Sequence, residues 1–427
     1  MLQSYDHALR LHADPSRVVV RPFHLAWQAS GLDQSRSERL VAEVLEMEDR
    51  QAAKQLTAVL KDFEPRHWQT RRVFMSRFEE IDAQLDRPLG DIGDTKRQLI
   101  GAYFCHEYSY AAAAIMNPSV VPHYDQTGMP DGSTRFIMSL RTVGEGHISS
   151  VAFREGIATD RGKLKLAPEP PFATAADTAT GEEEIPEGPV TVIRHRDSTL
   201  SGTVLFPITA AQKNGLEDLR LVQFTHEDGS TEWLGTYTAY SGREIQSELL
   251  RTRDWRHFDL VPIEGAASRN KGIALFPRKI GEHYMAIGRQ DGENLFLLKS
   301  DSIERWDGGD KILEPKYPWE FVQIGNCGSP IELDEGWLLL THGVGAMRKY
   351  SIGAVLLDKE DPSRVIARAS EPVLAAVKED REGYVPNVVY TCGAMRLGDL
   401  LFLPYGIADS SVAFAFVPIS EMLKQLK

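Results

Sequence analysis

Two arginines and one histidine stand at matching positions in a repeated pattern of the sequence. Arg141, Arg289 and His342 each occupy the sixth position of a short apolar segment that begins with an aromatic residue. A guanidinium is rarely buried without a partner, so core packing is a poor explanation for two arginines and a histidine at one offset. Each residue taken singly could serve a salt bridge or a local hydrogen bond. Together they predict a cluster that faces an anion or a sugar.

Carboxylates near the same segments could supply acid–base chemistry. Glu217 and Asp218 adjoin each other in a Gly-led stretch that we expect to form a loop before the second segment, and Asp409 follows the fifth segment. Carboxylates on turns usually face solvent. Two of them among cations nevertheless suit cleavage of a glycosidic bond, because one acid must protonate the leaving oxygen. Tyr240 lies near the end of the second segment, where its ring could stack on a sugar.

The segments that carry these residues belong to a fivefold repeat. Each has a short β-type run, then a turn and a second β-type run. The five first runs are 136–141, 233–238, 284–289, 337–342 and 401–406. Such repeats of antiparallel strands indicate a β-propeller, whereas a β-sandwich does not predict the same plan five times. The sequence therefore predicts a mainly β fold, a five-bladed β-propeller over residues 115–427.

The first part of the chain differs from the rest. Between residues 35 and 85, apolar residues such as Val41 and Val44 recur at helical spacing. Residues 1–114 are therefore predicted to form an α-helical region, with its last helix from about Thr95 to Met116. We interpret this region as a packing or oligomerisation element, so a homo-oligomer formed through these helices is one expected partner. The Ala-, Thr-, Glu- and Pro-rich stretch 168–189 is expected to be a surface loop.

Composition and charge argue against several classes of protein. A net charge of −13, from 48 basic and 61 acidic residues, disfavours binding to nucleic acid. The apolar runs are well short of the roughly 18 residues that a membrane span requires, and charges interrupt the start where a secretory signal needs an apolar core. The 3 cysteines form no CxxC pair, and no cluster has the spacing of metal ligands. We expect a cytoplasmic protein with no metal, no organic cofactor and no membrane partner.

Further motifs follow one another in a fixed order from residue 117 to the end of the chain. They include Asn117-Pro118, Ser139-Leu-Arg141, Gly215-Leu-Glu-Asp-Leu-Arg220, Tyr237-Thr-Ala-Tyr240, Asn270-Lys271, Gly336-Trp-Leu338, Thr341-His-Gly-Val344 and Tyr405-Gly-Ile-Ala-Asp409. Together they resemble glycoside hydrolase family 130, the β-mannoside phosphorylases and β-mannosidases. The resemblance implies a five-bladed propeller, and the helical region lies outside the part that it covers.

The resemblance also implies roles for individual residues. Asp218 matches the general acid, which acts through a hydroxyl of the mannosyl residue. Asn117, Arg141 and Asp409 match positions that hold the mannosyl sugar. From their own place in the sequence, Glu217 and Tyr240 are also expected to bind the sugar. Those expected to bind phosphate are Lys271, Arg289 and His342, assisted by Tyr350. Gln323 stands where the family pattern has a phosphate-binding lysine.

These roles predict an inverting glycoside phosphorylase. Inorganic phosphate, as co-substrate, and a β-mannosyl oligosaccharide would give α-mannose 1-phosphate and a free acceptor. Fixed cations can hold the charge of phosphate, whereas attack by water needs a carboxylate base. We expect structural roles for the carboxylates Glu145, Asp291 and Glu293. Two alternatives stay open: an inverting β-mannosidase on the same fold, which Gln323 favours, and a non-catalytic carbohydrate-binding propeller.

Overall fold

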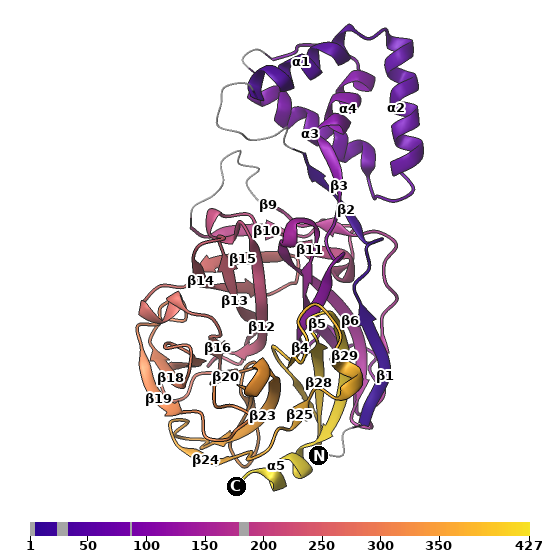
Figure 1. Cartoon of the computed structure of the whole chain (residues 1–427). Coiled ribbons are helices and arrows are strands. Elements are labelled where there is room, and N and C mark those ends of the chain that lie inside the picture. The colour runs from indigo at the N-terminus through magenta and orange to yellow at the C-terminus, as the bar shows by residue number, and fades with distance from the viewer. Residues whose placement is uncertain (1–4, 24–32, 86–87, 179–187) are drawn as a thin grey trace. The chain divides into compact units, whose positions relative to one another are not determined.

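The computed structural model of the chain describes residues 5–23, 33–85, 88–178 and 188–427 (Figure 1). They fall into two compact units. The sheet unit comprises Met1–Asp14, Ala111–Glu169 and Ala176–Lys427, and the helical unit comprises Pro15–Tyr110 and Pro170–Ala175. None of the helices in the described part of the chain has the length and hydropathy needed to cross a bilayer.

The helical unit has the helices that the sequence predicts, together with short strands. The helices are α1 (Asp33–Glu46), α2 (Asp49–Phe63), α3 (Thr70–Gln84) and α4 (Asp94–Tyr103). The strands are β2 (Val18–Pro22) and β3 (Cys105–Ser109), which pair antiparallel, and β8 (Thr174–Ala175). Val41 and Val44 of α1 are buried in one core with Leu99 and Ile100 of α4, which confirms the helical spacing.

The last predicted helix is shorter than expected. Helix α4 ends at Tyr103, and the following residues pair with β2 instead of continuing as a helix to Met116. Gly101 explains why α4 is held close to α3, because a Cβ at this position would lie 1.8 Å from the carbonyl oxygen of Phe74. The stretch 168–189 lies partly outside the described residues, and its described part contains β8 and β9 (Asp177–Thr178).

The boundary between the two units differs from the predicted one. Strand β1 (Tyr5–His12) belongs to the sheet unit, where it pairs antiparallel with β29 (Ser411–Pro418). Leu9 and Leu11 of β1 pack against a core that contains Phe402 and Phe414, which accounts for its place there. The helical unit is therefore an insertion between β1 and the next strand of the sheet unit, and residues 1–114 are not a single helical region.

The strands of the sheet unit that the structure describes belong to sheets of 12, six, five and four strands. Five antiparallel runs of four strands can be followed within these sheets, two of them in the 12-stranded sheet, and they are called groups 1 to 5. Group 1 has β4 (Ala114–Pro122), β5 (Ser133–Val143), β6 (Ser149–Thr159) and β7 (Leu164–Leu166). Group 2 has β12 (Gly215–Thr225), β13 (Thr231–Tyr240), β14 (Ile245–Thr252) and β15 (His257–Pro262). Group 3 has β16 (Ala274–Leu275), β17 (Tyr284–Gly288), β18 (Leu295–Ser300) and β19 (Gly309–Leu313).

The last two groups follow the same order. Group 4 has β20 (Gln323–Asn326), β22 (Trp337–Val344), β23 (Tyr350–Leu357) and β24 (Val365–Arg368). Group 5 has β26 (Val389–Tyr390), β28 (Leu400–Ile407), β29 and β1. Shorter elements are β10 (Val190–Ile193), β11 (Thr203–Leu205), β21 (Ile331–Glu332), β25 (Leu374–Ala375), β27 (Met395–Leu397) and α5 (Ile419–Gln425).

The predicted repeat matches this architecture. Each of the five predicted first runs lies on the second strand of one group, on β5, β13, β17, β22 and β28. The predicted polar residues therefore stand at or just beyond the carboxyl ends of second strands. In Figure 1 the first strands β4, β12, β16 and β20 lie toward the middle of the sheet unit, and β1, β19 and β24 lie at its periphery. The prediction of a mainly β fold is confirmed.

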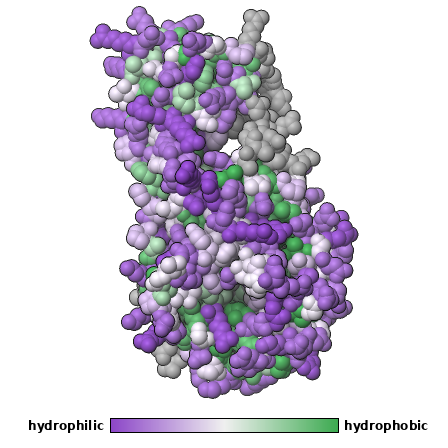
Figure 2. Space-filling model, turned by 180° about the vertical axis from the view of Figure 1, so that it is seen from behind, coloured by the Kyte–Doolittle hydropathy of each residue, from purple (hydrophilic) through white to green (hydrophobic). Residues whose placement is uncertain are grey.

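Apolar cores join each group to the next one. Phe153 of group 1 shares a core with Trp233 of group 2, and further cores join groups 2 and 3, groups 3 and 4, and groups 4 and 5. Phe136 and Met138 of group 1 pack with Phe402 of group 5. The contacts therefore run through all five groups and return from the last to the first. The face of the sheet unit seen in Figure 2 is mostly hydrophilic, in keeping with this inward placement of apolar residues.

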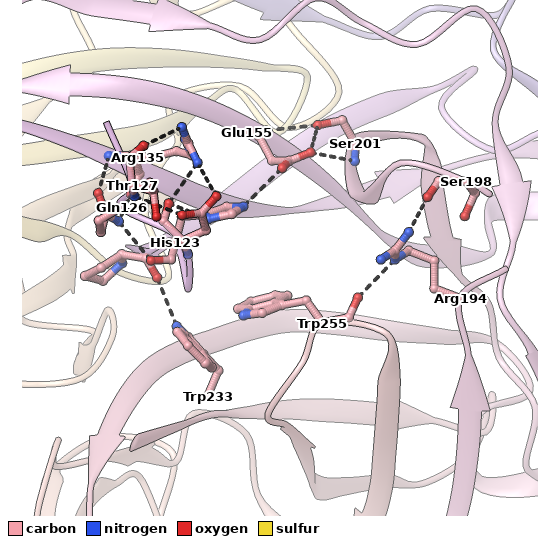
Figure 3. Close-up of polar contacts among 12 residues, drawn as sticks. His123, Gln126, Thr127, Arg135, Glu155, Arg194, Ser198, Ser201, Trp233 and Trp255 are labelled. Carbon is pink, nitrogen blue, oxygen red and sulfur yellow. Dashed lines mark hydrogen bonds and ion pairs between the residues drawn. The ribbon is translucent and has the colours of Figure 1, made fainter. Parts of the chain in front are cut away.

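A polar network also links groups 1 and 2 (Figure 3). Trp233 Nε1 donates a hydrogen bond to the carbonyl of Pro122 (3.0 Å). Glu155 accepts a hydrogen bond from the Ser201 hydroxyl (2.8 Å) and lies 3.3 Å from His123 Nε2. Because these groups satisfy one another, the His123 region has a structural role.

Candidate active site

The acidic motif lies on a strand and not in the loop that the sequence predicted. Glu217 and Asp218 belong to β12, whose pairing with β13 is interrupted by a bulge between Glu217 and Arg220. Asp218 has a left-handed backbone, with φ of 55°. Neighbouring residues of a regular strand point to opposite faces, and a bulge removes this alternation. The bulge therefore lets two adjacent carboxylates reach the same partner.

That partner is Arg141, at the end of the second strand of group 1. Its Nη2 donates to Glu217 Oε1 at 2.8 Å, and its Nη1 donates to Asp218 Oδ1 at 3.1 Å. Its Nε donates to the Ser149 hydroxyl at 3.0 Å. The guanidinium fork is thus divided between the two carboxylates, which fixes both of them with charge-assisted hydrogen bonds.

Asn117 approaches Asp218 from β4. Its Nδ2 donates to Asp218 Oδ1 at 2.7 Å, whereas its Oδ1 is buried and has no partner among the described residues. Gly406 of group 5 makes room for this side chain, since a Cβ there would lie 3.1 Å from the Asn117 backbone nitrogen. A buried acceptor without a donor is costly, so this oxygen is suited to receive a hydroxyl of a ligand.

Lys271, which is predicted to bind phosphate, forms an ion pair with the acidic cluster in this structure. Its Nζ donates to Glu217 Oε2 at 2.8 Å. Glu217 thus lies between Lys271 and Arg141, with one carboxylate oxygen bound to each. This cluster of Asn117, Arg141, Glu217, Asp218 and Lys271 is called the acid pocket below.

The two aspartates of this region have opposite pKa shifts. Burial alone would raise the pKa of Asp218, but the charges of Arg141 and Arg220 outweigh it and hold that pKa well below its usual range. Burial and the charge of Asp218 raise the pKa of Asp409 to about 6, against the influence of Arg141 and Arg348. Asp218 is therefore ionised, and Asp409 titrates close to neutrality.

Arg289 and His342 form a second cluster, as the sequence predicted. Arg289 Nη1 lies 3.1 Å from His342 Nε2. Burial, and then the charges of Arg289 and Arg220, lower the pKa of His342, so the imidazole is neutral and Nε2 can accept this hydrogen bond. The Tyr350 ring stacks on the His342 ring with centroids 5.8 Å apart. Tyr350 therefore supports the histidine.

Asn326 completes this cluster, and sequence reasoning missed it. Its side chain is fully buried, and neither its Oδ1 nor its Nδ2 has a partner among the described residues. Arg289 Nε is likewise buried and unpartnered in the described structure. A Cβ on Gly272 would lie 3.3 Å from Arg289 Nε and 3.7 Å from Asn326 Oδ1, so this glycine keeps the space between them open.

Arg289, Asn326 and His342 are called the anion pocket below. It presents one guanidinium, one amide and one neutral imidazole, and no described carboxylate forms an ion pair with Arg289. The sequence signal for Asn326 was weak, because Asn326-Cys-Gly-Ser329 has the composition of a turn. In the structure this asparagine ends β20, opposite Thr341 on the strand that carries His342.

Tyr240 and Gln323 lie near the two pockets without joining them. The Tyr240 hydroxyl donates to the carbonyl of Gly242 in its own hairpin (3.3 Å), and the described structure shows no hydrogen bond from it to the acid pocket. Gln323 is half-buried at the start of β20. In the described part of the chain, no group of three or more His, Cys, Asp or Glu residues is placed to hold a metal ion.

Comparison with known proteins gives consistent matches. The profile of a family described as beta-1,4-mannooligosaccharide phosphorylase matches residues 192–427. The chain is 34% identical to a 1,2-beta-oligomannan phosphorylase of Thermoanaerobacter sp. over 222 residues, which are 50% of this chain and 72% of that protein. It is 33% identical to a beta-1,2-mannobiose phosphorylase of Listeria innocua over 232 residues, which are 52% of this chain and 63% of that protein.

A solved structure matches a larger part of the chain. It is the beta-1,2-mannobiose phosphorylase from Listeria innocua in complex with beta-1,2-mannobiose. The match covers 73% of this chain and 92% of that one, with a TM-score of 0.51 and 24% sequence identity. At this identity the likeness concerns the fold.

Proposed function

The chain belongs to glycoside hydrolase family 130, and on this premise we propose that it is an inverting phosphorylase of β-mannosides. Inorganic phosphate and a β-linked mannoside would be converted to α-mannose 1-phosphate and a free acceptor sugar. The matched family and relatives, which are described as phosphorylases of β-1,2- and β-1,4-linked mannose compounds, support this assignment.

One observation carries the choice of phosphate over water. Arg289 Nε and both amide atoms of Asn326 are buried without partners among the described residues, and no described carboxylate pairs with Arg289. An inverting hydrolase needs a carboxylate base to activate water. Arg289 Nε and Asn326 Nδ2 are buried donors, and a cluster with these donors and without such a base is suited to hold an anion. Asp291, which follows Arg289 by two residues, is occupied by its own turn. Its carboxylate accepts hydrogen bonds from the Asn294 side chain and from the backbone of that turn.

The proposed reaction begins with attack of a phosphate oxygen on the anomeric carbon. The bond from that carbon to the glycosidic oxygen breaks, and inversion turns the β-mannoside into an α-linked phosphate. The leaving oxygen takes a proton that starts on Asp218 and passes through a hydroxyl of the mannosyl residue. Asn117 and Arg141 now bind Asp218. When their hydrogen bonds turn to the sugar, the pKa of Asp218 rises and it can carry this proton.

We also infer that the sheet unit is a five-bladed β-propeller. Each four-stranded group would be one blade, and β1 would supply the outer strand of the last blade. This inference is supported by the repeat of strand order and by the apolar contacts that return from group 5 to group 1. In a propeller the acid and anion pockets would share one central cavity, as a reaction between sugar and phosphate requires.

The experiment is to incubate the purified protein with β-1,2- and β-1,4-mannobiose, with and without phosphate, and to follow both products by NMR. We expect α-mannose 1-phosphate only when phosphate is present. Asp218→Asn should lower kcat by about 10²- to 10⁴-fold. Arg289→Gln should raise the KM for phosphate by about tenfold or more, since it removes charge-assisted hydrogen bonds.

Arg305→Gln is a matched control, because this exposed guanidinium pairs with Asp307 outside both pockets. It should leave both KM values unchanged. Release of free mannose at the same rate with and without phosphate would instead establish the hydrolase. Binding of mannobiose without any turnover would establish a carbohydrate-binding protein.

A further inference from the structure

Arg220 is a buried guanidinium that belongs to neither of the two pockets. It lies on β12, two residues after Asp218, and is 4% exposed. Its Nη1 donates to the carbonyl of Asp218 (2.9 Å), its Nε to the carbonyl of Cys327 (3.1 Å), and its Nη2 to the hydroxyl of Tyr390 (2.8 Å). It is not paired with a carboxylate side chain among the described residues. All three acceptors are neutral.

These acceptors lie next to both pockets. The carbonyl of Asp218 belongs to the left-handed residue in the bulge that presents the proposed acid. Cys327 directly follows Asn326 of the anion pocket. The Tyr390 ring contacts the His342 ring edge-on, with centroids 4.9 Å apart. One side chain therefore contacts the backbone of the acid pocket and two supports of the anion pocket.

The charge of Arg220 also acts on both pockets. After Arg141, it is the next largest charge that lowers the pKa of Asp218, and it adds to burial and Arg289 in lowering the pKa of His342. An uncompensated buried charge destabilises a fold. Besides the neutral carbonyls and the phenol, the nearby charge of Asp218 compensates it, so the arginine is tied electrostatically to the proposed acid and does not only fill space. A bound anion would compensate it further.

We propose that Arg220 is a positioning residue that couples the acid pocket to the anion pocket, by fixing the backbone of Asp218 and holding Tyr390 against His342. This inference rests on the proposed phosphorylase function. It predicts that phosphate binding and the placement of the acid change together when Arg220 is altered, although Arg220 belongs to neither pocket.

The test compares Arg220→Lys, Tyr390→Phe and their double variant. Lysine keeps the charge but cannot donate to three fixed acceptors, because its ammonium is a flexible point charge. We expect Arg220→Lys to lower kcat by about 10²-fold, since a small misplacement of a catalytic group has this effect. Tyr390→Phe removes only the hydroxyl that accepts from Arg220. It keeps the aromatic ring against His342 and leaves the hydrogen bond from Arg220 to the Asp218 carbonyl in place. It should raise the dissociation constant for phosphate severalfold with a smaller loss of kcat.

Phosphate binding is measured without turnover, from the NMR signals of the His342 ring during titration with inorganic phosphate. The two single effects on the phosphate dissociation constant should be non-additive in the double variant, because both substitutions remove the same hydrogen bond, the one between Arg220 and Tyr390. Arg368→Lys is the matched control. Arg368 is also buried and pairs with Glu320, and in the described structure no hydrogen bond joins it to a residue of either pocket, so its variant should lose thermal stability without changing phosphate affinity.

Three outcomes are distinct. If wild-type protein shows no phosphate-dependent signal or product, the proposed function fails. If wild-type protein binds phosphate and Arg220→Lys keeps both its kcat and its phosphate affinity within twofold, the coupling role is wrong. If the loss of activity in Arg220→Lys is no larger than its loss of thermal stability explains, and its phosphate affinity is unchanged as expected for Arg368→Lys, Arg220 is structural and the inference is likewise overturned.

Discussion

Asn117 and Asp218 stand 101 positions apart in the sequence and share a hydrogen bond of 2.7 Å. Both have left-handed backbones, with φ of 51° and 55°. Asparagine and aspartate adopt this conformation more readily than other residues with a side chain. Two unusual backbone positions are therefore used to bring one amide and one carboxylate together on different groups of strands.

This pair predicts the effect of Asn117→Asp. The substitution keeps a residue that tolerates a positive φ, but it replaces a hydrogen-bond donor by a second negative charge. The pKa of Asp218 should rise, because a like charge disfavours its ionised form. We expect a lower kcat/KM for the mannoside and a shift of the high-pH limb of the phosphorolysis profile to higher pH. Asn117→Ala, which adds no charge, should shift that limb less, and an equal shift would contradict the electrostatic explanation.

Gly325 lies against two side chains of the anion pocket and leaves no space for a larger residue. A Cβ there would lie 2.3 Å from Cε1 of His342 and 2.7 Å from Cδ of Arg289. Gly325→Ala should therefore push both side chains apart, raise the KM for phosphate by about tenfold and cost about 1–3 kcal/mol of stability. Gly308→Ala is the control, since a Cβ there has no neighbour closer than 3.8 Å. Unchanged phosphate kinetics in Gly325→Ala would show that phosphate does not bind between these side chains.

Lys271 and Arg289 predict opposite kinetic effects, although the sequence assigned both to phosphate. Lys271 Nζ binds Glu217 in the acid pocket, whereas Arg289 lies in the anion pocket. Lys271→Met should raise the KM for the mannoside severalfold and that for phosphate little. Arg289→Met should do the reverse. Steady-state kinetics with each substrate varied in turn decides this. A Lys271→Met variant whose main defect is in the KM for phosphate would show that Lys271 binds phosphate, as the resemblance implies.

The repeat could be read from the sequence because it is local. Each predicted first run combines apolar residues with a turn, and each lies on a second strand. Arg141, Arg289 and His342 could be identified because they share one offset in that repeat. Strand β1 could not be placed in the same way, since its partner β29 is at the other end of the chain and no local signal connects them.

The bulge at Asp218 and the role of Asn326 could not be predicted for a similar reason. The stretch Gly215–Arg220 begins with a glycine and contains two adjacent carboxylates, a composition typical of a turn. It is a bulged strand paired with β13, and the Arg141 side chain that binds its two carboxylates comes from another group of strands, a tertiary contact that the local composition does not reveal. Asn326 likewise gains its role only from Gly272 and Arg289, which lie on other segments.

Asp409 is expected to lower the stability of the fold at neutral pH, where its carboxyl is ionised in a partly buried position. The pKa of this carboxyl is about 6, against an ordinary value of 3.8, so the folded chain holds its proton more tightly than the unfolded chain does. Between pH of about 4 and 6 the folded state binds more protons, and the free energy of unfolding falls as the pH rises. Above pH 6 the ionised group costs at most about 3 kcal/mol. Asp409→Asn should remove this cost.

We therefore expect Asp409→Asn to unfold at a higher urea concentration than wild type at pH 7.5, with the difference shrinking toward zero near pH 4. Asparagine also tolerates the φ of 48° at this position. Asp291→Asn is a control of opposite sign, since hydrogen bonds from Asn294 and its own turn outweigh burial and lower the pKa of Asp291. That variant should gain nothing at pH 7.5. If Asp409→Asn is no more stable than wild type at pH 7.5, Asp409 is not held in an unfavourable ionised state. A gain in stability together with a loss of mannoside turnover would show that the Asp409 carboxylate is needed for binding or turnover of the sugar, although its charge destabilises the fold.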